Sequence, residues 1–167
     1  RRIHRVVSGG QSGADRAGLD AAVAAGVEYG GWCPASGWAE DYPCAPGLLA
    51  DYPGLREAPG SDPSLRTYLN VRDSHATLVI GDQGVRHGNW CSPGTDLTIR
   101  TAGALGRPLL RDSGDPAEVE RWLSGLGYEL TLNVAGPRES EQPGLYERAR
   151  VVLGALLGHS EASPDPK

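Results

Sequence analysis

Short apolar runs alternate with longer helical patterns along nearly the whole chain of 167 residues. The β-branched run at 3–7 precedes an alanine-rich helical segment at 13–27, and apolar runs at 76–80, 107–111 and 128–136 each precede another helical pattern. Strands that alternate with helices of this length form mostly parallel sheets with helices on both faces. The sequence therefore predicts an α/β fold with a mostly parallel sheet.

The remaining segments complete this pattern. A short strand is expected at 28–32, and helices at 64–74, opened by Ser64, and at 95–106, 115–126 and 137–157. In the last helix, Val151, Leu153, Leu156 and Leu157 are expected to face inward. The Pro/Gly-rich passage at 33–63 has little periodicity, and loops of this length are usually functional or mobile. We expect one domain over residues 1–158 and a disordered tail at 159–167.

Composition excludes several classes of protein. The formal net charge is −5 and no basic run interrupts the acidic background, so a nucleic-acid surface is not expected. No apolar run reaches the roughly 18 residues of a membrane span, and no signal peptide is recognisable, which predicts a cytoplasmic protein without membrane contact. The three cysteines, Cys33, Cys44 and Cys91, lack the CxxC spacing of a zinc knuckle, and neither they nor His87 predict a metal site.

Three of the predicted strand-to-helix turns have similar chemistry: 8–16, 89–98 and 133–140. The first contains SGGQSGADR, which fits neither the dinucleotide fingerprint nor the phosphate-binding P-loop. In a parallel sheet all three turns open on the same edge, where ligands bind, and the N–H groups of helix N-termini favour anions there. Candidate donors to an anion are Ser8, Gly9, Gly10, Gln11, Ser12, Gly13, Ser92, Gly94, Thr95 and Ser140, with Arg72 and Arg138 as candidate guanidinium forks.

Other side chains near these turns have two interpretations. Asp15, Asp73 and Asp96 suit either general acid–base catalysis or helix capping and solvated surface charge. Trp32, Trp38 and Trp90 lie in or beside the loops, where they could stack on a planar ring or fasten the loops to the core.

Several motifs together resemble a known family. The segments VVSGGQSGADRAGLDAA, GGWCP, AEDYP, YLNVRDSHATLVI, GTDLT, LNVAGPRES and PGLYERAR follow in this order between Val6 and Leu157. They resemble the bacterial molybdenum carrier family, within the superfamily that includes the cytokinin-releasing phosphoribohydrolases, also called lysine-decarboxylase-like proteins. The resemblance implies a Rossmann-like three-layer α/β/α fold that binds a phosphorylated or nucleotide-like ligand. Molybdenum cofactor, a pterin carrying a phosphate, and nucleotides are the candidate cofactors.

The same motifs assign ligand-binding positions residue by residue. The resemblance places them at Ser8, Gly9, Gly10, Gly13, Asp15, Arg16, Asn70, Arg72, Asp73, Ser74, Asn133, Gly136, Pro137, Arg138 and Ser140. This chain departs from the family pattern at His75, where Asp is usual, and at Pro93, which replaces a glycine and removes one N–H donor. Thr98 stands where the phosphoribohydrolases have a glutamate.

Two functions from different classes follow. The first is a binding or carrier protein for a phosphorylated, ring-containing small molecule. The second is a nucleoside-phosphate N-glycoside hydrolase using Asp15, Asp73 or Asp96, although Thr98 takes the place of the expected carboxylate. Self-association into a homo-oligomer is a further possibility.

Overall fold

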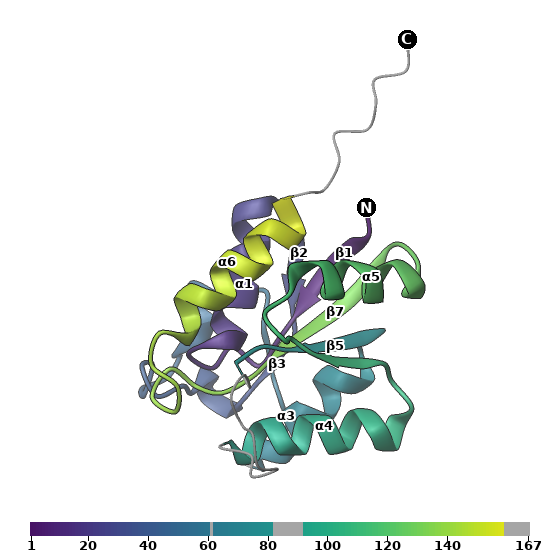
Figure 1. Ribbon diagram of the computed structural model, residues 1–167. Coiled ribbons are helices and arrows are strands. Elements are labelled where there is room, and N and C mark those ends of the chain that lie inside the picture. The colour runs from purple at the N-terminus through teal and green to yellow at the C-terminus, as the bar shows by residue number, and fades with distance from the viewer. Residues whose placement is uncertain (61, 82–91, 159–167) are drawn as a thin grey trace.

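The computed structural model of the protein describes residues 1–60, 62–81 and 92–158 (Figure 1). The expectations for His87, Trp90, Cys91 and the tail at 159–167 lie outside these residues. No helix in the described part of the chain combines the length and hydropathy needed to cross a bilayer.

A parallel sheet forms the middle of the molecule. Within the described residues it has five strands, in the spatial order β2 (Glu28–Gly30), β1 (Ile3–Val7), β7 (Leu130–Ala135), β5 (Ala76–Val79) and β6 (Leu109–Arg111). Every neighbouring pair is parallel. The strands β5 and β7 are buried along almost their whole length, as expected of strands covered on both faces.

Helices cover both faces of this sheet (Figure 1). One layer contains α1 (Ala14–Ala25), α5 (Pro116–Leu126) and α6 (Leu145–Gly158), and the other contains α3 (Pro63–Arg72) and α4 (Pro93–Leu105). The main core lies between the first layer and the sheet, where small alanines of α1 let this helix approach β1 and β7 closely. The predicted Rossmann-like three-layer α/β/α fold is confirmed.

The strand order also places the switch point of the sheet. When the strands are counted from β7 onward, with β1 and β2 next and then β5 and β6, the spatial order becomes 3-2-1-4-5. This is the order of the doubly wound dinucleotide-binding fold without its last strand. The order reverses between β7 and β5, and ligands of such sheets bind outside the carboxyl ends of the strands at this point.

The passage at 33–63 contains short elements that its composition did not predict. It forms a second, two-stranded parallel sheet from β3 (Trp32–Cys33) and β4 (Arg56–Glu57), a 3-10 turn at Ala35–Gly37 and the single-turn helix α2 (Leu48–Asp51). Leu48 and Leu55 pack with Leu19 of α1 in a small second core. This packing holds the passage against the first strand-to-helix turn.

Two helix predictions were wrong in detail. The helix expected from residue 137 begins at Leu145 and buries residues spaced by four, Leu145, Ala149, Leu153 and Leu157, while Val151 is 73% exposed. Helix α3 is capped by Asp62, whose carboxylate accepts a hydrogen bond from the Ser64 N–H at 2.9 Å. Proline at the first helical position and an aspartate before it outweigh the serine cap that the sequence suggested.

Candidate functional site

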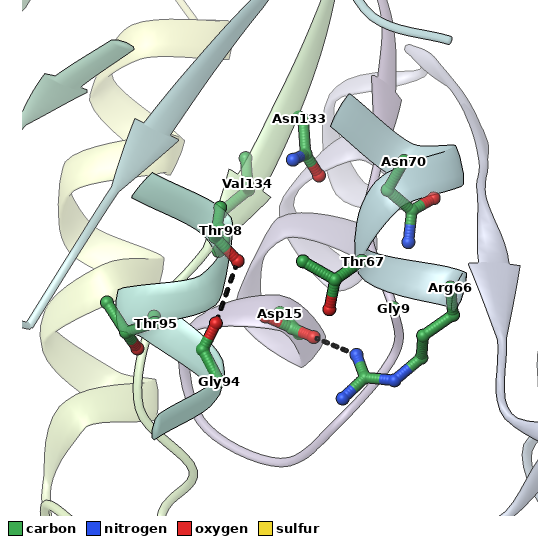
Figure 2. Close-up of a pocket in the computed structure, with 12 residues that line it drawn as sticks. Gly9, Asp15, Arg66, Thr67, Asn70, Gly94, Thr95, Thr98, Asn133 and Val134 are labelled. Atoms are coloured by element: carbon green, nitrogen blue, oxygen red, sulfur yellow. Dashed lines mark hydrogen bonds and ion pairs between the residues drawn. The ribbon is translucent and has the colours of Figure 1, made fainter. Parts of the chain in front are cut away.

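A polar cavity of about 40 Å³ lies at the switch point (Figure 2). It is lined by the end of β7 and the residue after it, by the turn after β1 with the first turn of α1, and by the facing surfaces of α3 and α4. Its lining consists of Gly9, Asp15, Arg66, Thr67, Asn70, Gly94, Thr95, Thr98, Asn133, Val134, Ala135 and Gly136. The structure thus brings seven of the predicted site residues together: Gly9, Asp15, Asn70, Gly94, Thr95, Asn133 and Gly136.

Arg66 supplies the positive charge of this cavity. Its guanidinium lies against the first turn, with Nη1 3.8 Å from Oδ2 of Asp15. The turn tolerates it because residue 9 is glycine: a Cβ at Gly9 would overlap Nη1 of Arg66. Figure 2 shows Arg66 and Asp15 facing each other, with Gly94, Thr95 and Thr98 of α4 on the other side of the cavity.

Asp15 is buried in the first turn of α1. Burial raises the pKa of its carboxyl to about 6, against the opposing effects of the Arg66 guanidinium and of the Gln11 N–H, which donates to Oδ2 at 3.4 Å. A carboxyl with this pKa exchanges its proton close to neutral pH. Asp15 is therefore chemically suited to proton transfer, and its protonation state responds to other charges in the cavity.

The N-terminus of α4 forms the facing wall. Ser92 caps the helix through its Oγ, which accepts from the Thr95 N–H at 3.3 Å, and Pro93 occupies the first helical position. Thr98 Oγ1 donates to the Gly94 carbonyl at 3.0 Å. Thr95 is 2% exposed, and within residues 1–60, 62–81 and 92–158 no hydrogen-bond partner reaches its Oγ1. A residue of the cavity wall thus has a buried hydroxyl without a partner at a helix N-terminus, where anions are favoured.

Two amides on the cavity wall are bound within the protein. Asn70 accepts from the Trp32 N–H at 2.8 Å and donates to the Trp32 carbonyl at 2.9 Å. Asn133 donates to Thr77 Oγ1 at 3.2 Å. These bonds hold α3 to β3 and β7 to β5, so the amides shape the cavity and fix its walls.

The first and third turns pack against each other. The Ala14 N–H donates to the Pro137 carbonyl at 3.4 Å, and a Cβ at Gly13 would lie 2.5 Å from this carbonyl oxygen. Ser8 Oγ donates to the Asp15 carbonyl at 2.9 Å and accepts from the Gly10 N–H at 3.2 Å. Gly13 and Ser8, which the sequence suggested as ligand contacts, thus build the turns themselves.

The Glu40 carboxylate binds several other residues that were predicted to donate hydrogen bonds to an anion. Ser12 Oγ donates to its Oε1, Ser140 Oγ donates to Oε2 at 2.6 Å, and Nη1 of Arg138 lies 3.6 Å from Oε2. The hydrogen bond from Ser12, which has the largest effect, and those from Ser140 hold the pKa of Glu40 below its usual range. The donors therefore bind a carboxylate of the protein rather than facing the switch-point cavity.

Arg16 is also bound by a carboxylate of the passage at 33–63, that of Asp41, which follows Glu40 in the sequence. Its guanidinium makes a bidentate pair with Asp41 at 2.8 and 2.9 Å, and Nε donates to the Gly10 carbonyl at 3.0 Å. The side chain is buried and lies over the rings of Tyr42 and Tyr52. Arg16 thus ties the first turn to the passage at 33–63.

Three predicted charges lie apart from the cavity lining. Arg72 pairs with Asp73, which also accepts from the Trp32 indole N–H at 2.9 Å, and Asp96 pairs with Arg100 one helical turn away. Gln11 donates to the Trp38 carbonyl at 2.9 Å. Of the three carboxylates considered for catalysis, only Asp15 lies in the cavity.

Sequence reasoning missed Arg66 and Thr67 as lining residues, and it considered Thr98 only as the replacement of a glutamate. The signal for Arg66 was its position four residues before Asn70 on the same expected helix, which puts both side chains on one face. Within the described residues, no group of three or more His, Cys, Asp or Glu side chains could hold a metal ion.

Comparison with known proteins identifies the family. The model of the "Circularly permutated YpsA SLOG family" matches residues 6–157. The chain belongs to this family. The circular permutation agrees with the strand order, which becomes that of the doubly wound fold once it is counted from β7.

A solved structure of similar sequence supports the assignment to the SLOG family. It is a protein of Syntrophus aciditrophicus SB named "Putative molybdenum carrier protein", 34% identical, with a TM-score of 0.77 over 91% of this chain and 93% of the other. The resemblance to the molybdenum carrier family is thereby confirmed. Among curated proteins, none matches this SLOG protein significantly.

Proposed function

We propose that this SLOG protein binds and carries a phosphorylated, ring-containing small molecule, with the anionic group in the switch-point cavity. The observation that carries the proposal is the buried Thr95 Oγ1, which has no hydrogen-bond partner within the described residues and belongs to a residue that lines the same cavity as Arg66. A buried polar group without a partner costs about 1–3 kcal/mol, and a bound water, ion or ligand group is one explanation of such groups in native proteins.

The cavity chemistry suits an oxyanion. The guanidinium of Arg66 offers a charged fork, the Thr95 hydroxyl offers a further donor, and the dipole of α4 favours an anion at its N-terminus. At about 40 Å³ the cavity exceeds the roughly 10–15 Å³ that one water requires, but it is far smaller than a nucleotide pocket. It therefore fits one phosphate-sized group, and the remainder of the ligand lies outside it.

The name of the Syntrophus protein raises molybdenum as cargo. The described residues contain no cluster of metal ligands, whereas the cavity has a guanidinium and a hydroxyl, which bind oxygen atoms of an anion. These residues suit molybdenum carried as an oxyanion, or in a cofactor held by its phosphate, and not as a directly coordinated ion.

Calorimetric titration with ribose 5-phosphate and AMP tests the proposal. Arg66→Ala should weaken binding about 10- to 100-fold, since a hydrogen bond to a charged group contributes about 1.5–3 kcal/mol. Arg66→Lys should recover part of it, because the charge remains but the fork is lost. Arg100→Ala, which removes an exposed arginine of α4 paired with Asp96, is the control. Equal affinities of wild type and Arg66→Ala would refute the cavity as the anion site.

A hydrolase remains the second proposal because of Asp15. This carboxyl lies in the cavity with a pKa of about 6, which is suitable for a general acid or base. Incubation with nucleoside 5′-monophosphates, followed by chromatography for free base, separates the two functions. Release of base that is abolished by Asp15→Asn would favour hydrolysis, and binding without turnover would favour the carrier.

The cellular context stays a prediction from the sequence. We propose a cytoplasmic location and a small-molecule ligand, without nucleic acid as a partner. Size-exclusion chromatography with light scattering tests whether the protein also self-associates.

A further inference from the structure

A second pocket of about 280 Å³ adjoins the switch-point cavity. The two share Arg66, whose side chain lines both, and the first turn contributes Gly9 to the cavity and Gln11 to the pocket. A ligand with its anion beside the Arg66 guanidinium can therefore extend into the pocket along the same side chain.

The walls of this pocket are largely apolar. They include Pro34, Ala35, Ala58 and Pro63, and Trp38 is the largest of the lining residues. The volume lies near the lower end of the roughly 300–1,000 Å³ of small-molecule sites. Such a pocket suits a single flat ring system, whose faces can pack on the apolar side chains while Gln11, Asp62 and Arg66 provide the polar part of the lining.

The exposure of Trp38 distinguishes a binding surface from a loop anchor. Its side chain is 43% exposed, whereas Gly37 and Ala39 on either side are buried. The Trp38 backbone is also fixed independently of the ring, because its carbonyl accepts from the Gln11 amide at 2.9 Å. The neighbouring residues thus fasten this part of the loop, and the indole remains available to the pocket.

We propose that Trp38 stacks on a planar heteroaromatic ring of the ligand and makes the protein selective for aromatic over plain sugar phosphates. The inference rests on the proposed function, since the anionic end of the same ligand occupies the cavity beside Arg66. Nucleotides and phosphorylated pterins share the required chemistry, a flat ring joined to a phosphate ester. Stacking on an aromatic side chain is tolerant of ring identity, because every such ring offers a π face.

Titration of the whole protein with four compounds tests this inference: AMP, neopterin 3′-phosphate, ribose 5-phosphate and adenosine. The first two should bind more tightly than ribose 5-phosphate, and the tighter of them identifies the source of the ring. Trp38→Ala should weaken binding of the aromatic phosphates about 5- to 100-fold and leave ribose 5-phosphate unchanged. Trp38→Phe should retain most of the affinity, because it keeps an aromatic face.

Tyr68→Ala is the matched control, since Tyr68 is similarly exposed, at 41%, on the helix that carries Arg66. Circular dichroism confirms that each variant is folded. If AMP and ribose 5-phosphate bind equally and Trp38→Ala changes neither, the ring site is refuted while the anion site stands. If ribose 5-phosphate fails to bind but adenosine binds in a Trp38-dependent manner, the ring site stands and the anion site is refuted. If none of the four compounds binds, both are overturned.

Discussion

The Glu40 carboxylate accepts a hydrogen bond from the Ser140 hydroxyl at 2.6 Å, although the two residues are 100 positions apart in the sequence. Ser12 and the Ser140 N–H donate to the other carboxylate oxygen. One side chain of the passage at 33–63 thus joins the first and third strand-to-helix turns. It occupies the donors that a ligand anion would otherwise use, which separates them from the switch-point cavity.

Glu40→Gln should lower the free energy of unfolding by about 1–2 kcal/mol, because an amide can accept at one position only and loses the attraction to Arg138. Urea denaturation at neutral pH measures this. Glu120→Gln on the exposed surface of α5 is the control. Binding of ribose 5-phosphate should stay within about twofold of wild type, and a large loss would place the ligand anion at Glu40 instead.

Gly9→Ala and Gly13→Ala should differ in kind. The new methyl at Gly9 meets the flexible end of Arg66, so the guanidinium shifts, ligand binding weakens and the fold survives. At Gly13, φ is +83° and the methyl meets the backbone of Pro137, so we expect a loss of about 1–3 kcal/mol in stability. Thermal melts and calorimetric titration on both variants measure the two effects. Similar changes in both variants would contradict this division.

Thr95→Val removes a buried hydroxyl and keeps the side-chain volume. Because Oγ1 has no hydrogen-bond partner within the described residues, the variant should be at least as stable as wild type. Affinity for ribose 5-phosphate should fall about 3- to 30-fold, since one donor to the anion is lost. Thr101→Val, whose hydroxyl donates only along its own helix α4, is the control. A marked loss of stability in Thr95→Val would show that the hydroxyl is bound within the protein.

Asp15 should make both stability and anion binding depend on pH. Its carboxyl keeps a proton up to about pH 6 in the folded protein but loses it near 3.8 when unfolded, so folding is favoured at low pH. This contribution is lost as the pH rises from about 4 through 6, and amounts to roughly 3 kcal/mol at most. Asp15→Asn should remove it and be the more stable protein at neutral pH.

The same proton should govern binding. Above about pH 6 the Asp15 carboxylate repels an anion and competes for Arg66, so affinity for sulfate, whose charge is constant over this range, should rise as the pH falls through 6. In Asp15→Asn the affinity should be independent of pH. Titrations of both proteins against sulfate at several pH values check this, and a pH-independent wild type would contradict it.

The sheet and its covering helices could be predicted because each strand and helix has its own local signal. The β-branched run at 3–7 became β1 with the expected bounds, and the apolar run at 76–80 became β5. The elements within 33–63 could not be predicted, because strands of two residues such as β3 and β4 have no period to detect. Their stability comes from packing on Leu19, a tertiary contact.

The location of the site could be predicted from the sequence, but the roles of most of its charged residues could not. The switch-point rule located the edge of the sheet, and Gly9, Thr95 and Gly136 do line the cavity. The roles of the charged residues depended on pairings between distant segments, such as Arg16 with Asp41. An arginine next to a glycine-rich turn looks the same in sequence whether it binds a ligand or a carboxylate of its own chain.

The position of β7 in the sheet also bears on how the protein is made. This strand alone connects the pair β1–β2 to the pair β5–β6 within the described sheet, yet it is synthesised after the other four described strands of this sheet. The two halves cannot join through β7 before this strand has been made, and the contacts that join β1 to β7 are distant in sequence, which slows folding. Because the end of β7 lines the switch-point cavity, a nascent chain can form this cavity only after β7 has been synthesised, long after the first turn that lines its other side.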